Sequence, residues 1–385
     1  MPLVPSFVIR SPREVLFGWN AIRELPGAAK KLGSRPLVVI GGGSIRRGGL
    51  LDGVLEGLRD HGLKPFLFEG VGHDPSVEII DLGREAFARD ACDLVIGLGG
   101  GSVMDAAKAI AGLANEDAPT AEFVGGREIS PDCVPNICCT TTSGTGSEVT
   151  HVSVLTDPER RLKASIRTEG MMPSVAIVDP ALTLSVPPEQ TAFTGLDALT
   201  QALESYLSRG DNPFSDHLAL EAAVRISAWL PVAYTEGDNR EARENMSLGS
   251  MFAGLALASA RLGLVHGIAH PLGALYGLAH GEACALLLPY VLEFNAPVRA
   301  PKMAMAARAM GISAELNDDD ATVELIEWTE RLCEEMGCRR RFAEFGLKHE
   351  DYSAIIEATM ASGSSKANPR IVREEDVVAL LDKAM

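Results

Sequence analysis

The sequence has no apolar run long enough to cross a membrane, and it has no excess of basic residues. Its longest apolar runs, such as Met251–Ala260 and Ala283–Leu288, fall short of the roughly 18 residues that a spanning helix needs. Lys and Arg number 35 against 52 Asp and Glu, which gives 385 residues a formal net charge of −17. A chain this acidic is a poor general binder of nucleic acid or of an anionic membrane. We therefore expect neither as a partner.

The N-terminus also lacks the basic stretch and apolar stretch of a signal peptide. The seven cysteines are odd in number, contain no CxxC pair and lie mostly in apolar surroundings. This usage predicts a reduced, cytoplasmic protein. Internal repeats are absent, and the length exceeds the usual one-domain size of about 150 residues, so two domains are expected.

The first half alternates short apolar runs with amphipathic stretches, which is typical of a parallel sheet with crossover helices. The runs predicted as buried strands are Pro36–Ile40, Pro65–Phe68, Asp93–Ile96, Asn136–Cys139 and Val175–Val178. The stretches predicted as helices are Gly49–Asp60, Val77–Arg89 and Val103–Leu113. An edge hairpin formed by Ser6–Arg10 and Glu14–Phe17 is expected at the start of the chain.

The pattern changes after a proline-containing linker at Ser185–Pro188. Beyond it no segment predicts a strand, and helical periodicity dominates. The helices are expected at Thr191–Ser208, Pro213–Leu230, Arg240–Leu262, Ala300–Ala307, Asp320–Met336 and Glu374–Lys383. The sequence thus predicts an α/β domain over residues 1–185 and an all-α domain over residues 186–385.

A glycine-rich strand–helix junction lies at Leu94–Lys108, which reads LVIGLGGGSVMDAAK. Glycines let the backbone approach a ligand closely, and a helix N-terminus offers free N–H groups to a phosphate. The segment departs from the GxGxxG dinucleotide fingerprint because position 102 is Ser. We interpret it as a diphosphate-binding loop.

Two further loops follow strands in the same half. Gly41-Gly42-Gly43-Ser44 carries no acid for a ribose 2′-hydroxyl, and Arg46 and Arg47 come next. This favours NADP over NAD, although the arginines can also simply flank a loop. Thr140–Thr150 reads TTTSGTGSEVT, a hydroxyl-rich loop that is a weak signal alone.

Three of the eight histidines, His266, His270 and His280, lie within fifteen residues. His266 and His270 are four apart and share a helix face. Asp197 and Gln201 share a face of another predicted helix in the same way. A carboxylate and several imidazoles make a candidate site for a divalent metal, although buried core histidines are the alternative.

Taken together, these motifs resemble the iron-containing (group III) alcohol dehydrogenase family along essentially the whole chain. The segments that carry the resemblance are GGGSVMDAAK at Gly99–Lys108, TTSGTGSEVT at Thr141–Thr150 and the long signature at Gly263–Asn295. The resemblance implies a dinucleotide-binding α/β domain plus an all-α domain (a dehydroquinate synthase-like fold), with the active site between them. It also implies a homodimer or larger homo-oligomer.

The resemblance further implies particular site residues. The metal, Fe²⁺ or Zn²⁺, would be bound at Asp197, position 201, His266 and His280, and His270 would relay a proton or contact substrate. The implied cofactor-binding residues for NADP, with NAD as the alternative, are Gly41, Gly42, Ser44, Asp74, Gly100, Gly101, Ser102, Asp105, Thr141, Thr142, Thr145, Thr150 and Lys163.

One position departs from the family pattern, because residue 201 is Gln where the family has His. Gln is a weaker ligand than imidazole, so we expect weakened metal binding. The expected reaction is hydride transfer between a nicotinamide and the carbonyl of a small-molecule aldehyde or ketone. A metal-independent reductase of an oxo acid, resembling maleylacetate reductases, is the main alternative; a lyase on the same fold and a cofactor-binding scaffold are the others.

Overall fold

The computed structural model describes residues 6–47, 49–338 and 341–385. Two compact units contain these residues. One comprises residues 10–142 and 146–184, and the other comprises residues 185–385 together with 143–145 and 6–9. We call them the nucleotide unit and the helical unit.

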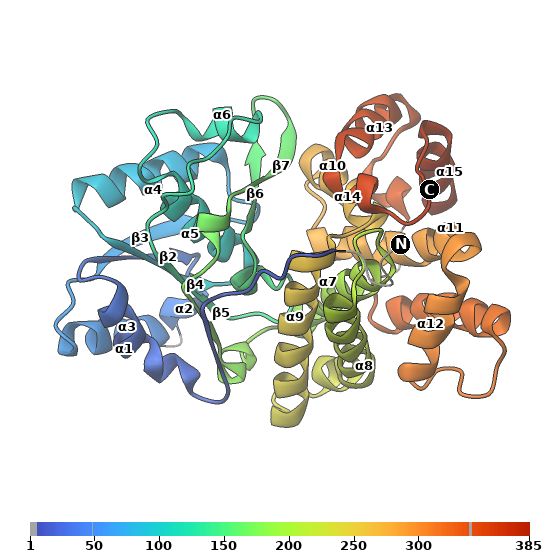
Figure 1. Ribbon diagram of the computed structural model, residues 1–385, viewed down its shortest axis with the longest axis horizontal. Helices are drawn as coiled ribbons and strands as arrows, with labels where there is room; N and C mark the ends of the chain where they lie inside the picture. Colours follow the sequence, from blue (N-terminus) through green and yellow to red (C-terminus); the bar gives the residue numbers. More distant parts are fainter. Residues whose placement is uncertain (1–5, 48, 339–340) are drawn as a thin grey trace. The chain divides into compact units, whose positions relative to one another are not determined.

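A parallel six-stranded sheet forms the centre of the nucleotide unit, with strand order β1-β8-β5-β4-β2-β3 (Figure 1). Its strands are β1 (Glu14–Phe17), β2 (Pro36–Gly41), β3 (Phe66–Val71), β4 (Leu94–Gly99), β5 (Asn136–Thr140) and β8 (Val175–Val178). Every residue of β4, β5 and β8 is buried. Strands covered on both faces read as unbroken apolar runs, and this explains why the sequence predicts them.

Alternate residues of β2 divide the core of this unit into two layers. Leu37 and Val39 pack on one side with residues of α4 and α5, and Val38 and Ile40 pack on the other with residues of α1 and α3. The helices of this unit are α1 (Leu25–Leu32), α2 (Ser44–Arg47), α3 (Leu50–Asp60), α4 (Val77–Arg89), α5 (Gly101–Leu113) and α6 (Thr120–Val124). The 3₁₀ turns are η1 (Ala21–Glu24), η2 (Ser147–Val149), η3 (Glu169–Met171) and η4 (Pro180–Thr183).

The short helices α1, α2 and α6 of this unit are absent from the sequence prediction, and two features of its strands also differ. The predicted edge hairpin is wrong, because β1 pairs in parallel with β8, with Glu14 opposite Val175, and residues 6–10 form no strand. Strand β8 thus supplies β1 with the backbone hydrogen-bond partners that a hairpin would have supplied. An antiparallel hairpin of β6 (Val152–Asp157) and β7 (Leu162–Arg167) was not predicted.

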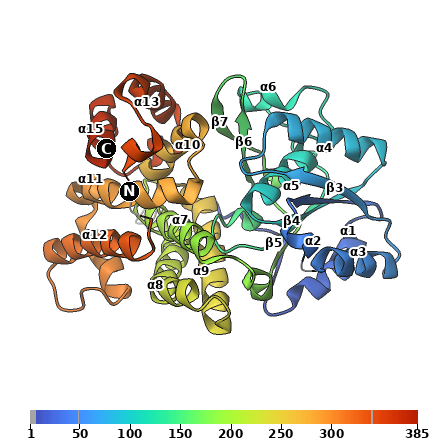
Figure 2. The same cartoon turned by 180° about the vertical axis from the view of Figure 1, so that it is seen from behind.

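The helical unit is all-α, as the sequence predicts. Its helices are α7 (Pro188–Leu207), α8 (Pro213–Thr235), α9 (Arg240–Ala260), α10 (Leu264–Tyr276), α11 (His280–Ala309), α12 (Asp318–Glu335), α13 (Tyr352–Ala361), α14 (Gly363–Ala367) and α15 (Glu374–Ala384). The 3₁₀ turns are η5 (Phe342–Phe345) and η6 (His349–Asp351). Helix α11 continues through three prolines, so it is far longer than the predicted Ala300–Ala307 segment. Figure 2 shows α7, α8 and α9 side by side, with α11 and α12 beyond them.

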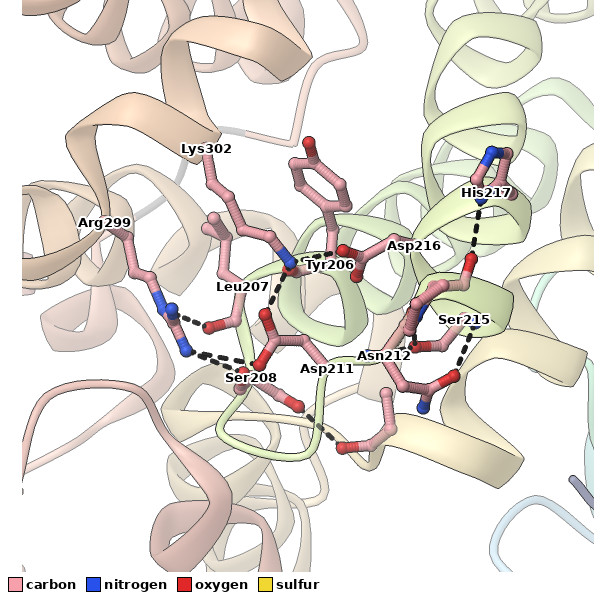
Figure 3. Close-up of polar contacts among 12 residues, drawn as sticks. Tyr206, Leu207, Ser208, Asp211, Asn212, Ser215, Asp216, His217, Arg299 and Lys302 are labelled. Atoms are coloured by element: carbon pink, nitrogen blue, oxygen red, sulfur yellow. Dashed lines mark hydrogen bonds and ion pairs between the residues drawn. The ribbon is translucent and has the colours of Figure 1, made fainter. Parts of the chain in front are cut away.

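Two cations of α11 fix this helix to the C-terminal end of α7 (Figure 3). The Lys302 ammonium donates to the Tyr206 carbonyl at 2.8 Å and lies 2.6 Å from Asp211 and 2.7 Å from Asp216. The Arg299 guanidinium donates to the carbonyls of Leu207 and Ser208, both at 2.9 Å. Cations are favourable at a helix C-terminus because its last carbonyls lack intrahelical partners. These contacts therefore align the two helices.

All seven cysteines are thiols, and none of them forms a disulfide. In the described part of the chain, no single helix is both long and apolar enough to span a membrane. The bent pair α9–α10, with 103° between its helices, meets that test only when the two are joined.

Candidate active site

One face of α7 carries three buried polar residues, Asp197, Gln201 and Glu204. They are four and three residues apart, so a helix of 3.6 residues per turn aligns them. A buried carboxylate needs a charged or hydrogen-bonding partner. Their partners come from α10 and α11.

Glu204 orients the first histidine. Its Oε2 lies 2.6 Å from Nδ1 of His266, and its Oε1 accepts the backbone N–H of Val265 at 2.6 Å. The carboxylate thus satisfies a donor in the first turn of α10, where intrahelical acceptors are missing. With Nδ1–H directed at Glu204, Nε2 is the nitrogen of His266 that can bind a metal in exchange for its proton, which is the usual carboxylate–histidine arrangement of metal sites.

Four potential metal ligands converge in front of this imidazole. They belong to Asp197, His266, His280 and Cys284, and one donor atom of each lies within 4.8 Å of all the others. Asp197 Oδ1 lies 3.3 Å from His266 Nε2 and 3.6 Å from His280 Nε2. Although it is buried, this oxygen makes no hydrogen bond. A buried carboxylate oxygen that lacks a hydrogen bond and faces two imidazole nitrogens fits a divalent cation.

The charge distribution agrees with this fit. Burial works to raise the pKa of Asp197, but His280, His266 and the Gln201 amide outweigh it and hold that pKa below its usual value. Burial likewise works to lower the pKa of His266, but Cys284, Asp197 and Glu204 raise it well above the usual value. The carboxylates of this cluster therefore stabilise a positive charge placed between them, whether on an imidazole or on a metal ion.

Gln201, where the family has His, contacts the same carboxylate. Its Nε2 donates to Asp197 Oδ2 at 3.0 Å. Its Oε1 is buried and has no hydrogen-bond partner. The amide nitrogen of Gln201 thus orients Asp197. The amide oxygen, which is neutral, is left as a weak metal ligand.

His270 lies one turn beyond His266 on α10. Its ring centroid is 6.2 Å from that of His266 and 5.3 Å from that of His280, and it stacks on His280 at an interplanar angle of 23°. It is partly exposed and is not among the four clustered donors. His270 therefore lies next to the candidate metal ligands but is not placed as one of them.

Sequence patterns alone missed two residues of the site, Glu204 and Cys284. Both had a detectable signal, because Glu204 is seven residues after Asp197 and Cys284 is four after His280. In each case the spacing continues the helix face of a predicted ligand.

The glycine-rich junction in the nucleotide unit is built for close strand–helix packing. A Cβ at Gly99 would lie 2.6 Å from a Val103 methyl, and one at Gly97 would lie 2.8 Å from Ala107 Cβ. These two glycines therefore let α5 pack directly on β4. Gly100 precedes the first turn of α5, and Gly101 and Ser102 begin it. The first N–H groups of α5 belong to this turn, as a phosphate site requires.

Three of the predicted cofactor residues meet at this junction. The Asp74 backbone N–H donates to Ser102 Oγ at 3.3 Å, and the Lys163 ammonium lies 2.6 Å from Asp74 Oδ1. Lys163 comes from β7, so the hairpin that the sequence did not predict carries a predicted residue. Asp74 has a positive φ of 52°, which is uncommon for a non-glycine residue and often marks a functional loop.

Other predicted cofactor residues are engaged inside the protein. Asp105 accepts from Ser147 Oγ at 2.5 Å and from the Val154 backbone N–H at 3.0 Å. The buried Lys108 ammonium donates to Thr150 Oγ1 at 3.1 Å. Asp105 and Thr150 thus tie the Thr-rich loop to α5.

The rest of that loop divides between the units. Thr141 and Thr142 directly follow β5, and the Thr141 N–H donates to the Gly99 carbonyl at 2.8 Å. Thr145 belongs to the 143–145 segment of the helical unit. In that segment Ser143 Oγ lies 3.0 Å from Ser247 Oγ of α9.

The end of β2 carries Gly41 and Gly42, with no acid among the described side chains that follow directly. Arg46 is exposed and forms an ion pair with Glu69 at 2.7 Å. The backbones of Ser44 and Arg47 belong to α2, but their side chains lie outside the described part of the structure.

Comparisons with known proteins agree with this geometry. The family model "Iron-containing alcohol dehydrogenase" matches residues 12–180, and "Fe-containing alcohol dehydrogenase family, C-terminal" matches residues 191–385. The chain belongs to the iron-containing alcohol dehydrogenase family. It is an NAD(P)-dependent oxidoreductase of the alcohol dehydrogenase class, which interconverts an alcohol and an aldehyde or ketone.

Similar proteins with known names cover nearly the whole chain. The NAD-dependent methanol dehydrogenase of Bacillus methanolicus is 32% identical over 97% of this chain and 98% of its own. The NADPH-dependent butanol dehydrogenase of Clostridium saccharobutylicum is 33% identical over 96% of each chain. The solved structure of a 1,3-propanediol oxidoreductase superposes with a TM-score of 0.94 at 35% identity, covering 99% of this chain and 100% of that chain. These similarities do not favour the alternative of a metal-independent oxo-acid reductase.

Proposed function

We propose that the chain transfers hydride reversibly between NADP(H) and the carbonyl carbon of a small aldehyde or ketone at a divalent-metal site. The ligands are Asp197, His266 and His280, with the Gln201 amide oxygen as a weaker contact. The observation that carries the proposal is the buried Asp197 Oδ1, which has no hydrogen bond yet faces two imidazole nitrogens.

The residues of the chain have distinct roles in this proposal. A divalent metal, Fe²⁺ or Zn²⁺, supplies a Lewis acid that stabilises the negative charge developing on the substrate oxygen. Glu204 holds the imidazole of His266 in the tautomer that presents Nε2. His270, beside the ligands and partly exposed, carries the alcohol proton to or from solvent.

Preference for NADP is supported by the end of β2. Gly41 and Gly42 present no carboxylate to repel a 2′-phosphate, and Arg46 is exposed nearby on α2. Glu69 competes for that guanidinium, so the preference should be moderate. Named relatives include both an NAD-dependent and an NADPH-dependent enzyme, and family membership alone therefore does not select the cofactor.

Metal removal and restoration test the proposal. The protein is stripped with a chelator, and the oxidation of NADPH and NADH by a panel of aldehydes, ketones and oxo acids is followed before and after adding Fe²⁺ or Zn²⁺. We expect turnover of an aldehyde or ketone only after metal is restored, and His266→Ala should abolish it. The control is His217→Ala, because His217 is exposed on α8 and bonds only its own helix at Pro213.

Full turnover by the stripped wild type, unchanged by added metal, would overturn the metal-assisted mechanism. Turnover confined to unsaturated or oxo acids under those conditions would restore the metal-independent reductase.

A further inference from the structure

We propose that the thiolate of Cys284 is the fourth strong ligand of the metal, replacing the imidazole that this chain lacks at position 201. The inference rests on the proposed metal-dependent function. It assigns the chain a carboxylate–imidazole–imidazole–thiolate set in place of the family's carboxylate and three imidazoles.

The placement of Cys284 is the first argument. Cys284 follows His280 by four residues on α11, so the two side chains share a helix face. The thiol is fully buried. Its Sγ lies 3.8 Å from His280 Nε2 and 4.0 Å from His266 Nε2. It therefore faces the same two nitrogens that Asp197 Oδ1 faces.

The distances are those of ligands around one ion. With bonds of about 2.0 Å to N or O and about 2.3 Å to S, tetrahedral ligands lie about 3.3 Å apart, or about 3.6 Å when one is sulfur. The carboxylate oxygen is 3.3 and 3.6 Å from the imidazole nitrogens, and the sulfur is 3.8 and 4.0 Å from them. These four pairs need a contraction of at most a few tenths of an ångström to reach tetrahedral spacing, and the other two pairs lie within 4.8 Å.

Other buried cysteines of the helical unit show the contrast. Cys333 directs its Sγ at the Ala285 carbonyl at 3.3 Å, and Cys338 directs its own at the Met336 carbonyl at 3.5 Å. A carbonyl accepts the S–H of a structural thiol. The partners of Cys284 are instead the two imidazole nitrogens that also face Asp197 Oδ1.

Gln201 is poorly suited to the role that Cys284 would take. Its amide nitrogen is committed to Asp197 Oδ2, and its oxygen is a neutral, weak donor. We infer that Gln201 positions the Asp197 carboxylate, whereas the Cys284 thiolate supplies a second negative charge to the metal. Two anionic ligands, Asp197 and Cys284, then balance a divalent ion.

The ligand set also has a consequence for metal choice. Thiolate is a soft ligand that favours Zn²⁺ or Co²⁺ in a tetrahedral site, and Zn²⁺ exceeds Fe²⁺ in intrinsic affinity for such sites. We therefore expect the wild type to prefer Zn²⁺ over Fe²⁺ and to lose part of that preference when Cys284 is replaced.

Cobalt spectroscopy tests the proposal independently of turnover. Stripped wild type, Cys284→Ala, Cys284→Ser and Cys333→Ala are loaded with Co²⁺, and the thiolate-to-cobalt absorption band in the near ultraviolet is recorded. We expect the band in the wild type and in Cys333→Ala, the matched control. We expect it to vanish in both Cys284 variants, with Zn²⁺ affinity lower by at least about tenfold in Cys284→Ala. Circular dichroism of the stripped proteins shows whether each variant is folded, and Cys284→Ser, the closest in size, serves if Cys284→Ala is not.

Each outcome decides between proposals. A band that is absent from the cobalt-loaded wild type, or that persists in the Cys284 variants, overturns the thiolate ligand. If metal-dependent turnover survives in that case, the proposed function stands without Cys284. A wild type that binds neither Co²⁺ nor Zn²⁺ overturns the thiolate ligand, and one that binds no Fe²⁺ either overturns both proposals.

Discussion

Glu204 Oε2 lies 2.6 Å from Nδ1 of His266, within a buried pair. The same carboxylate accepts the Val265 N–H, so one side chain both satisfies a donor in the first turn of α10 and orients the imidazole that we propose as a metal ligand. This relationship makes Glu204 a positioning residue whose effect is measurable through the metal.

Replacing Glu204 by Gln should weaken metal binding by roughly 10- to 100-fold, the usual effect of losing such a carboxylate partner. The amide oxygen can still accept one N–H, but its neutral charge supports His266 less well. Competition with a coloured chelator measures the affinity. Glu221→Gln on α8, which changes an exposed acid of an i,i+4 ion pair, should leave it unchanged. Equal affinities for Glu204→Gln and wild type would contradict the assignment.

Metal affinity should rise with pH. The anionic neighbours of His266 outweigh its burial and raise its pKa well above the usual value, and burial raises the pKa of Cys284 to about 11. Both groups must lose protons to bind a metal, so protons compete at low pH and the competition fades as pH rises toward these pKa values. Below these pKa values the apparent affinity should increase about tenfold per pH unit for each proton displaced. Calorimetry in buffers of different ionisation enthalpy counts those protons, and a pH-independent affinity would refute the prediction.

His270→Ala should lower kcat by roughly 10²-fold, as expected for the loss of a proton-transfer group. Metal content should not change, because His270 is outside the donor cluster. Elemental analysis and steady-state kinetics are run on the same preparations. Loss of metal together with activity would instead make His270 a ligand, and an unchanged kcat would remove it from the reaction.

Gly42→Asp should shift cofactor preference from NADPH toward NADH by roughly 10- to 100-fold in the ratio of kcat/KM, because a carboxylate repels the 2′-phosphate. Gly42 is the cleaner position, since a Cβ there would meet no other atom within 4 Å, whereas a Cβ at Gly41 would lie 3.2 Å from the Val71 carbonyl oxygen. Gly42→Asn, with the same size and no charge, is the control. A wild type that already prefers NADH would contradict the expectation.

Lys302→Ala should destabilise the helical unit by about 2 kcal/mol. A hydrogen bond to a charged group contributes about 1.5–3 kcal/mol, and partial exposure of the Lys302 side chain (21%) keeps the total for its several contacts well below their sum. Removal leaves Asp211 and Asp216 together without their shared cation. The thermal midpoint of the helical unit should fall by about 5 °C, the scale for a unit of about 200 residues. Lys348→Ala, which removes an exposed ion pair with Glu350, should produce no comparable fall.

The elements predicted correctly are those whose signal is local. Strands β2, β4, β5 and β8 are continuous apolar runs, and α4 was predicted with its exact bounds. The pairing of β1 with β8 joins residues about 160 positions apart, and no local pattern specifies it. In the β6–β7 hairpin only β6 alternates buried and partly buried residues. Most of β7 is partly buried without alternation, and polar side chains on both strands make the segment resemble a loop in composition.

The residues of the candidate site also differ in whether the sequence carries a signal for them. Asp197, His266 and His280 were recognised by residue type and motif, and the structure brings them together. Glu204 and Cys284 escaped notice because a lone Glu or Cys on an apolar helix is common. Helix packing brings Glu204 of α7 and Cys284 of α11 to His266 of α10, whereas Cys284 reaches His280 within its own helix.

The donors of the metal cluster all come from three helices of the helical unit, between residues 197 and 284. No atom of the nucleotide unit is needed to complete that set. Exchange of a cofactor bound to the nucleotide unit would therefore remove no ligand from an ion bound there.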